Sequence, residues 1–354
     1  MNASYQMPYS KDLPIIEVPQ HLFGELEDPR VQRRRRHPLN EILSIALCST
    51  IAGGDGWEDM ENFGQAKEAW FKSWLKLEQG IPSDDTFRRV ISAIDPKEFN
   101  KILLLYKDWV NKDISCAKKC NSNELKEQIS VDGKCLRSAK DSDHKKGAFY
   151  MVNAWSTKMG MALGQVKVNG KSNEITAIPE LLKIISLEGC VISIDAAGTQ
   201  KNIARAIVLG GGDYVLAVKG NQATLHDEMC NYFEQAISYY DELNKEGQKA
   251  VPNMESFDID VHIKEERGHG RLEKREVFVS KDLSWLPVQK EWKGLYSLML
   301  VRSTRTYQGK TSVELRYYIS SLDCGASEGG KYIRGHWAVE NSLHWVLDVA
   351  FNED

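Results

Sequence analysis

The chain has 354 residues, of which 42% are hydrophobic and 27% are charged, and its formal net charge is −4. A chain of this length can form two or three domains, each with a core of its own. It has no apolar run of roughly 18 residues and no basic segment followed by an apolar one at the N-terminus, which argues against a membrane-spanning or secreted protein. The seven cysteines are scattered, as is usual in a reducing compartment. We therefore expect a cytoplasmic protein.

Residues 1–122 are predicted to form a helical domain. Apolar residues recur at helical spacing over residues 37–54, which end in glycines. Ser83 is placed to N-cap a further helix, and Pro96 is placed at the first position of the next. A basic run precedes these helices and consists of Arg30 and Arg33–Arg36. This run is either a solvated linker or a contact to phosphates.

Residues 123–245 are predicted to form the first part of an α/β core. The segment QISVDGK predicts a short strand that ends at Asp132, and residues 147–168 predict two strands joined by a tight turn. Helices and strands then alternate over the rest of this segment. Strands joined by short turns are antiparallel, whereas strands joined through helices are parallel. The expected fold class is therefore α/β, with a mixed five-stranded sheet flanked by helices.

Residues 246–322 are predicted to form a β-rich insertion into this core. Alternating apolar and polar residues predict two strands around the basic, glycine-rich turn RGHGR, and two more around Tyr307–Lys310. Residues 323–354 return to helical spacing and are predicted to add a helix to the core. The chain is thus expected to have a helical domain and a core that is interrupted by the insertion.

Two aspartates lie at the ends of predicted core strands. Asp132 ends the first strand, and Asp195 follows the apolar strand CVISI. These strands are expected to be parallel neighbours, so that the two carboxylates face one another at the same edge of the sheet. Two carboxylates this close cannot both ionise cheaply without a cation between them, and oxygen ligands suit Mg²⁺ or Mn²⁺. The sequence therefore predicts a divalent metal site.

The last predicted helix brings a third acidic residue. His336, Glu340, His344 and Asp348 lie four residues apart and form a polar stripe, with apolar residues on the other side. Glu340, near the centre of this stripe, is the predicted third metal ligand. An alternative is a zinc site made by His336, Glu340 and His344, which leaves the two aspartates unexplained. Asp348 is most simply interpreted as part of a solvated helix end.

Several motifs resemble those of one known family. They are GIPSDDTFRRV, SVDGKCLRSA, KSNEITAIPELL, SIDAAGTQKNIA, DYVLAVKGNQ, RGHGRLEKR, RYYISSL and IRGHWAVENSLHWVLDVAFNED. Over almost its whole length the chain is similar to DDE transposases of the ISAs1 insertion-sequence family, which includes the H-repeat-associated proteins. The resemblance implies an RNase H-like domain with Asp132, Asp195 and Glu340 as its acidic triad. It also implies two Mg²⁺ or Mn²⁺ ions in each active site and a β-rich insertion before the glutamate.

The resemblance is not complete. In the related IS4 pattern a Tyr and an Arg precede the glutamate and a Lys follows it, whereas these places here hold Ile333, His336 and Leu347. The family pattern also continues beyond FNED, so we expect a chain truncated at its C-terminus. The residues expected to contact DNA, mainly at phosphates, are Lys134, Arg137, Lys219, Asn221, Gln222, Arg267, Arg271, Lys274, Arg275, Arg334, His336 and His344. For the four cations of the insertion, the alternative is a solvated hairpin tip.

The resulting hypothesis is a transposase of an insertion sequence, which cuts and joins DNA strands at transposon ends by a two-metal mechanism. Its expected partners are the double-stranded DNA of the terminal repeats and target DNA, bound by a homodimer associated with the nucleoid, and no membrane. Recognition of the ends is expected in residues 1–122, where a helix-turn-helix is one hypothesis. The alternatives are a truncated or dormant transposase that binds DNA without catalysis, and an RNase H-like nuclease that cuts without joining.

Overall fold

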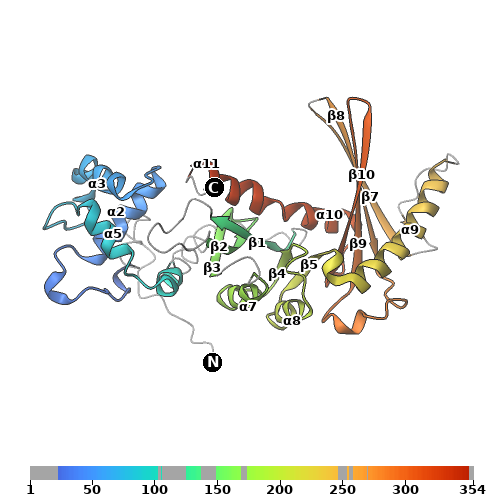
Figure 1. Ribbon diagram of the computed structural model, residues 1–354, viewed down its shortest axis with the longest axis horizontal. Helices are drawn as coiled ribbons and strands as arrows, with labels where there is room; N and C mark the ends of the chain where they lie inside the picture. Colours follow the sequence, from blue (N-terminus) through green and yellow to red (C-terminus); the bar gives the residue numbers. More distant parts are fainter. Residues whose placement is uncertain are drawn as a thin grey trace. The chain divides into compact units, whose positions relative to one another are not determined.

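The computed structural model describes residues 23–102, 105, 125–136, 149–168, 174–245, 253–254, 258–268 and 270–350. The chain divides into two compact units, Met1–Asn121 and Ser122–Asp354 (Figure 1). Among the described residues, no helix is both long enough and apolar enough to cross a membrane.

The N-terminal unit is helical, as predicted. Its elements are the short helix η1 (Gln32–Arg34), α2 (Leu39–Ile51), α3 (Trp57–Ala66), α4 (Glu68–Phe71) and α5 (Asp84–Ile91), followed by helical residues 96–102. They surround a core in which Ile42, Ile45, Phe71 and Phe87 are fully buried. Ser83 precedes α5 in extended conformation, but its hydroxyl lies 3.1 Å from the Thr86 hydroxyl and makes no side-chain cap to the backbone.

Two arginines of the basic run form ion pairs and hydrogen bonds with neighbouring residues of the same loop. Arg30 forms an ion pair with Asp28 at 2.8 Å and donates a hydrogen bond to the His37 carbonyl at 2.7 Å. Arg35 reaches the same Asp28 carboxylate at 3.4 Å and donates to the Arg30 carbonyl at 2.9 Å. These contacts close a loop ahead of α2, and they hold the pKa of the Asp28 carboxyl below its usual value against the opposing effect of its burial.

The second unit begins with five strands in the order β3-β2-β1-β4-β5. They are β1 (Glu127–Leu136), β2 (Phe149–Ser156), β3 (Met161–Val168), β4 (Cys190–Ile194) and β5 (Asp213–Val218). β1, β2 and β3 are antiparallel to one another, and β4 is parallel to both β1 and β5. This confirms the predicted mixture, which follows from short turns between the first three strands and helical connections between the later ones.

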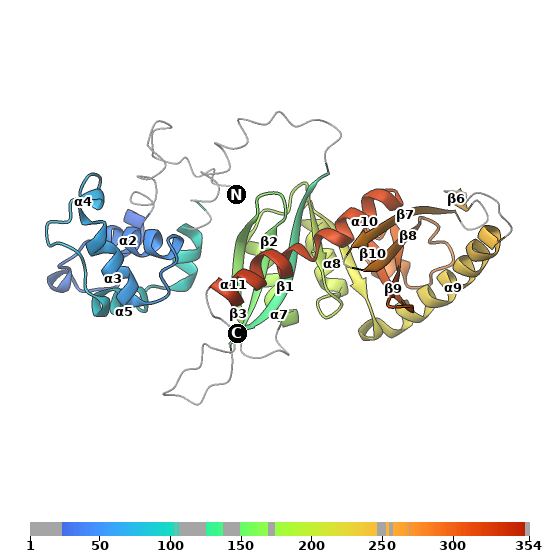
Figure 2. The same cartoon turned by 90° about the horizontal axis from the view of Figure 1, so that it is seen from above.

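Helices cover both faces of this part of the sheet (Figures 1 and 2). α7 (Glu174–Ile184) and α8 (Lys201–Leu209) lie on one face, and the C-terminal helical stretch crosses the other. This stretch consists of α10 (Ala326–Gly335), the π-helical segment η5 (Val339–His344) and α11 (Trp345–Ala350). The long helix α9 (Ala223–Lys245) extends from the end of β5 along the insertion.

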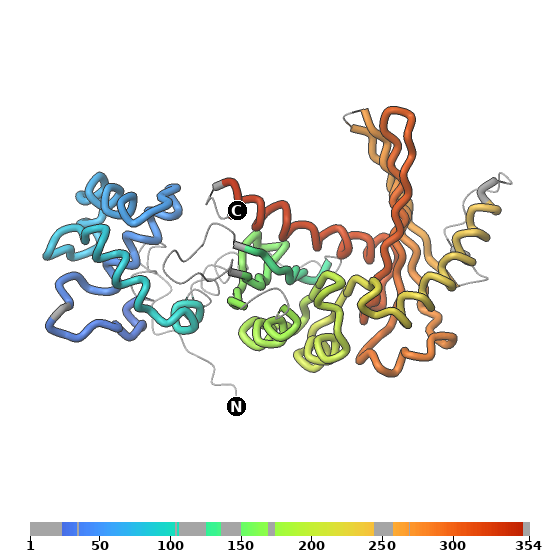
Figure 3. The backbone as a smooth tube through the Cα atoms, in the orientation of Figure 1, coloured from blue at the N-terminus to red at the C-terminus, as the bar shows by residue number. Residues whose placement is uncertain are grey.

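The insertion is continuous with the first five strands, contrary to the expectation of a separate five-stranded sheet. Its strands are β6 (Asn253–Met254), β7 (Ile259–Gly268), β8 (Arg271–Ser280), β9 (Ser297–Tyr307) and β10 (Lys310–Ser320). β10 pairs antiparallel with β5, so the described strands form one ten-stranded sheet in the order β3-β2-β1-β4-β5-β10-β9-β8-β7-β6. The β7–β8 and β9–β10 hairpins project beyond the helices as long twisted ribbons (Figure 3).

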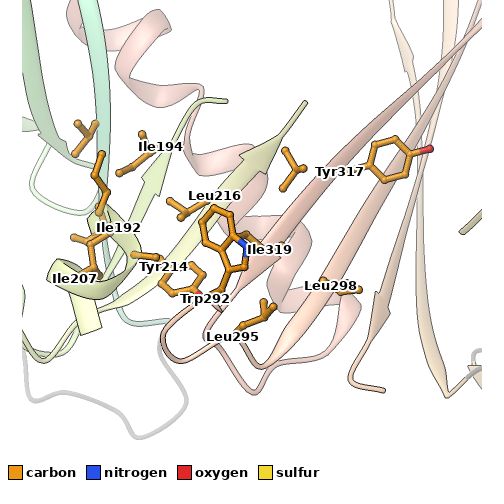
Figure 4. Close-up of a cluster of buried hydrophobic side chains, with 14 of the residues drawn as sticks. Ile192, Ile194, Ile207, Tyr214, Leu216, Trp292, Leu295, Leu298, Tyr317 and Ile319 are labelled. Atoms are coloured by element: carbon orange, nitrogen blue, oxygen red, sulfur yellow. The ribbon is translucent and has the colours of Figure 1, made fainter. Parts of the chain in front are cut away.

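The apolar core runs across this junction without a break. Figure 4 shows side chains from β4, α8, β5, β9 and β10 packed together with Trp292 and Leu295 of the segment before β9. Tyr214, Leu216 and Ile319 are fully buried in this cluster. Because the strand ends that carry the aspartates share this core with the insertion, the two parts are expected to fold as one unit.

Candidate active site

One face of β1 carries four polar side chains in succession. Gln128, Ser130, Asp132 and Lys134 alternate with Ile129 and Val131, whose side chains are buried in the core on the opposite face. The prediction that this strand ends at Asp132 is wrong, because it continues to Leu136 and pairs with β2 throughout. Asp132 therefore lies within a strand and faces the C-terminal helical stretch.

The first two polar residues fix α10 to the sheet. The Gln128 amide donates to the Ser193 hydroxyl at 2.9 Å and to the Tyr332 carbonyl at 2.7 Å. Ser130 donates to the Gly335 carbonyl at 3.4 Å. A Cβ at Gly335 would collide with the Gln128 amide, so a larger residue at this crossing would displace that amide from its hydrogen bonds. These buried hydrogen bonds fix the distance between α10 and the strands. The point at which they do so lies about one and a half helical turns before Glu340.

His336 belongs to the same network. Its Nδ1 lies 3.0 Å from the Ser193 hydroxyl, which in turn donates to Ser130 at 3.2 Å. Burial lowers the pKa of His336, although the negative charge of Asp195 opposes this shift. In the structure His336 contacts Ser193 of the sheet, and its expected contact with DNA stays a prediction.

Asp132 and Asp195 come from neighbouring parallel strands. Ser130 pairs with Ser193 in the register, so Asp132 and Asp195 follow at equivalent positions and face the same side. The Asp132 side chain is 17% exposed. Burial first, and then the charges of Asp195 and Glu340, raise the pKa of Asp132 to about 7. Asp195 Oδ1 accepts a hydrogen bond from the Gly198 amide at 3.0 Å.

Glu340 and His344 reach Asp132 from the helical side. His344 Nδ1 lies 3.6 Å from Asp132 Oδ2 and 3.6 Å from Glu340 Oε2. One ligand atom from each of these residues lies within 4.8 Å of the others, so the group can hold a metal ion. Asp195 adjoins this group in the strand register without being one of its three members. The donor set fits a divalent cation, because two carboxylates and an imidazole are crowded together with no cationic side chain among them.

A π-helical segment carries Glu340 and His344. In a regular α-helix, positions four residues apart rotate by about 40° at each step, so a stripe of four such positions leaves one face. The wider π-helical turn rotates in the opposite sense over four residues and returns His344 toward the sheet. The predicted stripe from His336 to Asp348 is therefore held on the sheet side by an irregularity that the four-residue spacing does not reveal.

Lys134 and Asp348 form an ion pair at the far end of the stripe. The Lys134 side chain is 7% exposed and that of Asp348 is 31% exposed. Interpreting Asp348 as part of a solvated helix end is thus wrong. Lys134, expected to contact DNA, instead anchors α11 to β1, and its positive charge lies near His344, whose pKa is lowered mainly by burial.

Two amide side chains support the loop that follows Asp195. Asn221 and Gln222, in the short helix η3 (Gly220–Gln222), donate to the carbonyls of Ala196 and Thr199, respectively. These residues were expected to contact DNA, and the structure gives them a positioning role. Lys219, which precedes them, is exposed.

The cations of the insertion alternate with glutamates. Arg271 and Arg275 contact Glu273, and Lys274 contacts Glu276 at 2.8 Å. Arg267 is exposed. Arg334 of α10 lies 3.7 Å from Glu266, which Arg275 also contacts. Arg137, another expected DNA contact, lies outside the described residues.

A groove of 920 Å³ lies between the insertion strands and α10. Its basic lining residues are Lys264, Lys274, Arg275, Arg305, Arg316, Lys331 and Arg334, and its acidic ones are Glu273 and Glu314. Trp337 is 44% exposed at this groove, and the Arg316 guanidinium lies 4.9 Å from its ring centre. Ala338 and Asn341, which are close to Glu340 in sequence, also line the groove. Sequence analysis missed Arg316, Lys331 and Trp337.

Comparison with known proteins identifies the family to which the chain belongs. The family described as "Transposase DDE domain" matches residues 123–354, and the family described as "DDE_Tnp_1-associated" matches residues 20–107. The chain therefore belongs to the DDE transposase family.

Its relatives include two Escherichia coli proteins. The chain is 41% identical to "Putative transposase YncI" of E. coli O157:H7, over 93% of this chain and 79% of that one. It is 38% identical to "H repeat-associated putative transposase YhhI" of strain K12, over 93% of this chain and 82% of that one. Among solved structures, a piggyBac transposase synaptic complex with hairpin DNA is 12% identical, with a TM-score of 0.36, over 95% of this chain and 65% of that one.

Proposed function

We propose that the chain is a transposase of an ISAs1-type insertion sequence, which cleaves and joins DNA strands at transposon ends. The observation that carries this proposal is that two further carboxylates, Asp195 at the end of the adjacent parallel strand and Glu340 on the facing helix, both lie close enough to Asp132 to raise the pKa of its carboxyl. The strand order β3-β2-β1-β4-β5, with helices on both faces, is the arrangement expected of an RNase H-like core. Membership of the DDE transposase family supports the same chemistry.

The triad would hold two divalent ions, Mg²⁺ or Mn²⁺. Such ions supply the activation of a water or 3′-hydroxyl group and the stabilisation of the leaving oxygen. The chain's own contribution is to hold the carboxylates in place. Gln128, Ser130 and His336 set the helix against the strands, and the Lys134–Asp348 ion pair fixes its far end. Asn221 and Gln222 brace the loop behind Asp195.

The proposed division of labour follows the chain. Residues 1–122 bind the transposon ends, residues 123–245 and 323–354 form the catalytic core, and residues 246–322 form the insertion. The partners are the double-stranded DNA of the terminal repeats and target DNA, bound by a homodimer.

The groove between the insertion and α10 is the proposed path of the DNA backbone near the scissile phosphate. Its basic lining, and the presence of Ala338 and Asn341 from the segment that carries Glu340 in its wall, support this assignment. Lys331→Ala is expected to weaken DNA binding and to reduce the slope of log affinity against log salt by about one. Lys290→Ala removes an equally exposed lysine outside the groove and is the matched control. Fluorescence anisotropy at several salt concentrations measures both, and equal slopes for the two variants would remove the groove from the path.

The function is tested by incubating the chain with DNA that carries candidate terminal repeats, with Mg²⁺ or Mn²⁺ and with EDTA. Metal-dependent nicking at the repeat ends and joining to a target are the expected results. Glu340→Gln is the control, because it keeps the size of the side chain and removes its charge. Cleavage without joining would indicate a nuclease instead, and equal products from the chain and Glu340→Gln would overturn the proposed active site.

A further inference from the structure

His344 has a setting that the three acidic residues do not explain. Its side chain is 6% exposed, and its Nδ1 faces two carboxylates, those of Asp132 and Glu340, at 3.6 Å each. Its Nε2 is buried without a hydrogen-bond partner among the described residues. Burying a polar nitrogen without a partner costs free energy, so stability alone gives no reason to place an imidazole here.

The spacing of the three donor atoms suits a shared ion better than direct hydrogen bonds. The distance of 3.6 Å from Nδ1 to each carboxylate oxygen is longer than an ordinary hydrogen bond. Ligand atoms bound to an octahedral ion at about 2.1 Å lie about 3.0 Å apart when adjacent and about 4.2 Å apart when opposite. The observed distances fall between these values, and the whole group spans at most 4.8 Å.

The positions of the neighbouring groups keep His344 available as a ligand. His336, the other histidine of the stripe, already contacts Ser193 at 3.0 Å. The Lys134 ammonium, whose charge acts on His344, is paired with Asp348. The His336 imidazole and the Lys134 ammonium are therefore both engaged elsewhere. Neither occupies the space between Asp132 and Glu340 that the His344 imidazole faces.

We propose that His344 Nδ1 is a nitrogen ligand of the ion held by Asp132 and Glu340, and that it shifts the preference of the site from Mg²⁺ toward Mn²⁺. This inference rests on the proposed function, because it assumes that the acidic group binds a divalent ion. Mg²⁺ takes oxygen ligands almost exclusively, whereas imidazole nitrogen suits first-row transition ions. A site with two carboxylates and one imidazole therefore favours Mn²⁺ over Mg²⁺ more strongly than a site with three carboxylates does.

Electron spin-echo spectroscopy of the Mn²⁺-loaded full chain tests the ligand directly. We expect modulation from a ¹⁴N nucleus bound to Mn²⁺, and we expect the pattern to change when the histidines alone carry ¹⁵N. His344→Gln should abolish the nitrogen modulation. His226→Gln is the control, because it removes a histidine of α9 outside the acidic group and should leave the modulation in place.

Metal affinities give a second readout that is independent of catalysis. His344→Gln should weaken Mn²⁺ binding by about 10- to 100-fold, a range seen when groups that tune metal ligands are removed, and should change Mg²⁺ binding less. Isothermal titration calorimetry measures both ions on the same samples. Equal losses for Mn²⁺ and Mg²⁺ would overturn the proposed preference.

The outcomes separate this inference from the proposed function. If the chain binds Mn²⁺ and Asp132→Asn abolishes that binding, but no ¹⁴N modulation is seen, then His344 is no ligand and the acidic site stands. If the chain binds no Mn²⁺ and cuts no DNA, the proposed function itself fails. The ¹⁵N-histidine experiment uses the unaltered chain, so a folding defect in His344→Gln does not block the test.

Discussion

Asp132→Asn is expected to abolish DNA strand cleavage while making the metal-free protein more stable. Removing one group that stabilises charge in the transition state typically costs about 10²–10³-fold in rate, and loss of a proposed metal ligand places the expected decrease at about 10³-fold or more. DNA binding should change little, because Asp132 is mostly buried at the strand and the cations of the groove are untouched. A cleavage assay and an anisotropy titration on the same variant measure the two effects, and cleavage at the rate of the unaltered chain would contradict the assignment.

The gain in stability follows from the raised pKa of Asp132, which is about 7 in the folded protein. The unfolded chain has a value of about 3.9, and a difference of about three pKa units corresponds to at most about 4 kcal/mol. A raised carboxyl pKa means that the folded state binds more protons. The free energy of unfolding therefore decreases as the pH rises from about 4 to about 7, and the whole loss is present above pH 7. Asparagine removes this penalty.

In EDTA at pH 8, Asp132→Asn should raise the free energy of unfolding by about 1–4 kcal/mol, and the gain should vanish near pH 4. Adding Mn²⁺ should stabilise the unaltered chain and not the variant. Asp227→Asn, which changes a carboxylate whose side chain is 76% exposed, is the control and should have little effect. A gain that is independent of pH would show that burial and charge repulsion do not govern Asp132.

Arg302→Met is expected to destabilise the insertion by about 3–5 kcal/mol, the usual cost of removing one partner from a buried ion pair. The Arg302 side chain is 12% exposed and bridges two elements. Its guanidinium donates to both oxygens of Asp241 on α9, at 2.7 and 2.9 Å, and to Glu276 on β8 at 2.7 Å. Glu276 is 1% exposed, and without Arg302 its remaining ion-pair partner is Lys274.

Hydrogen exchange of the β8 and β9 amides is the appropriate measurement, because it reports on this part of the chain separately from the N-terminal unit. Arg302→Lys keeps the charge but loses the planar fork, so an intermediate loss of protection is expected. Adding Glu276→Gln to Arg302→Met should recover part of the loss, since it removes a buried charge that has lost one of its two ion-pair partners. Unchanged exchange in Arg302→Met would mean that the apolar packing of β8, β9 and α9 is sufficient.

Local patterns predicted most of the secondary structure. The N-terminal helices, the antiparallel start and parallel continuation of the sheet, and the paired strands of the insertion are confirmed. Alternation of apolar and polar residues determines which side of a strand faces the core, so these elements are visible in the sequence. The domain boundaries stay predictions, as do the triad and its metal ions.

Long-range partners could not be predicted in the same way. The alternation of apolar and polar residues in QISVDGK extends past Asp132 to Lys134. It indicates a strand longer than the predicted one, and the observed strand continues to Leu136. Nothing local indicates that Lys134 meets Asp348, or that β10 pairs with β5 and extends the sheet into the insertion. Such pairings depend on which side chains and strand edges are still unpaired once the apolar core has formed. A single sequence does not specify them.

The distance along the chain between Asp195 and Glu340, 145 residues, also has a consequence for biosynthesis. Both aspartates leave the ribosome well before the helix that carries Glu340, because synthesis proceeds from the N-terminus at about 5–20 residues per second. A nascent chain or an early-terminated fragment thus holds its two strand carboxylates without the closing helix. If the proposed active site is correct, such a fragment lacks Glu340 and is expected to cleave no DNA.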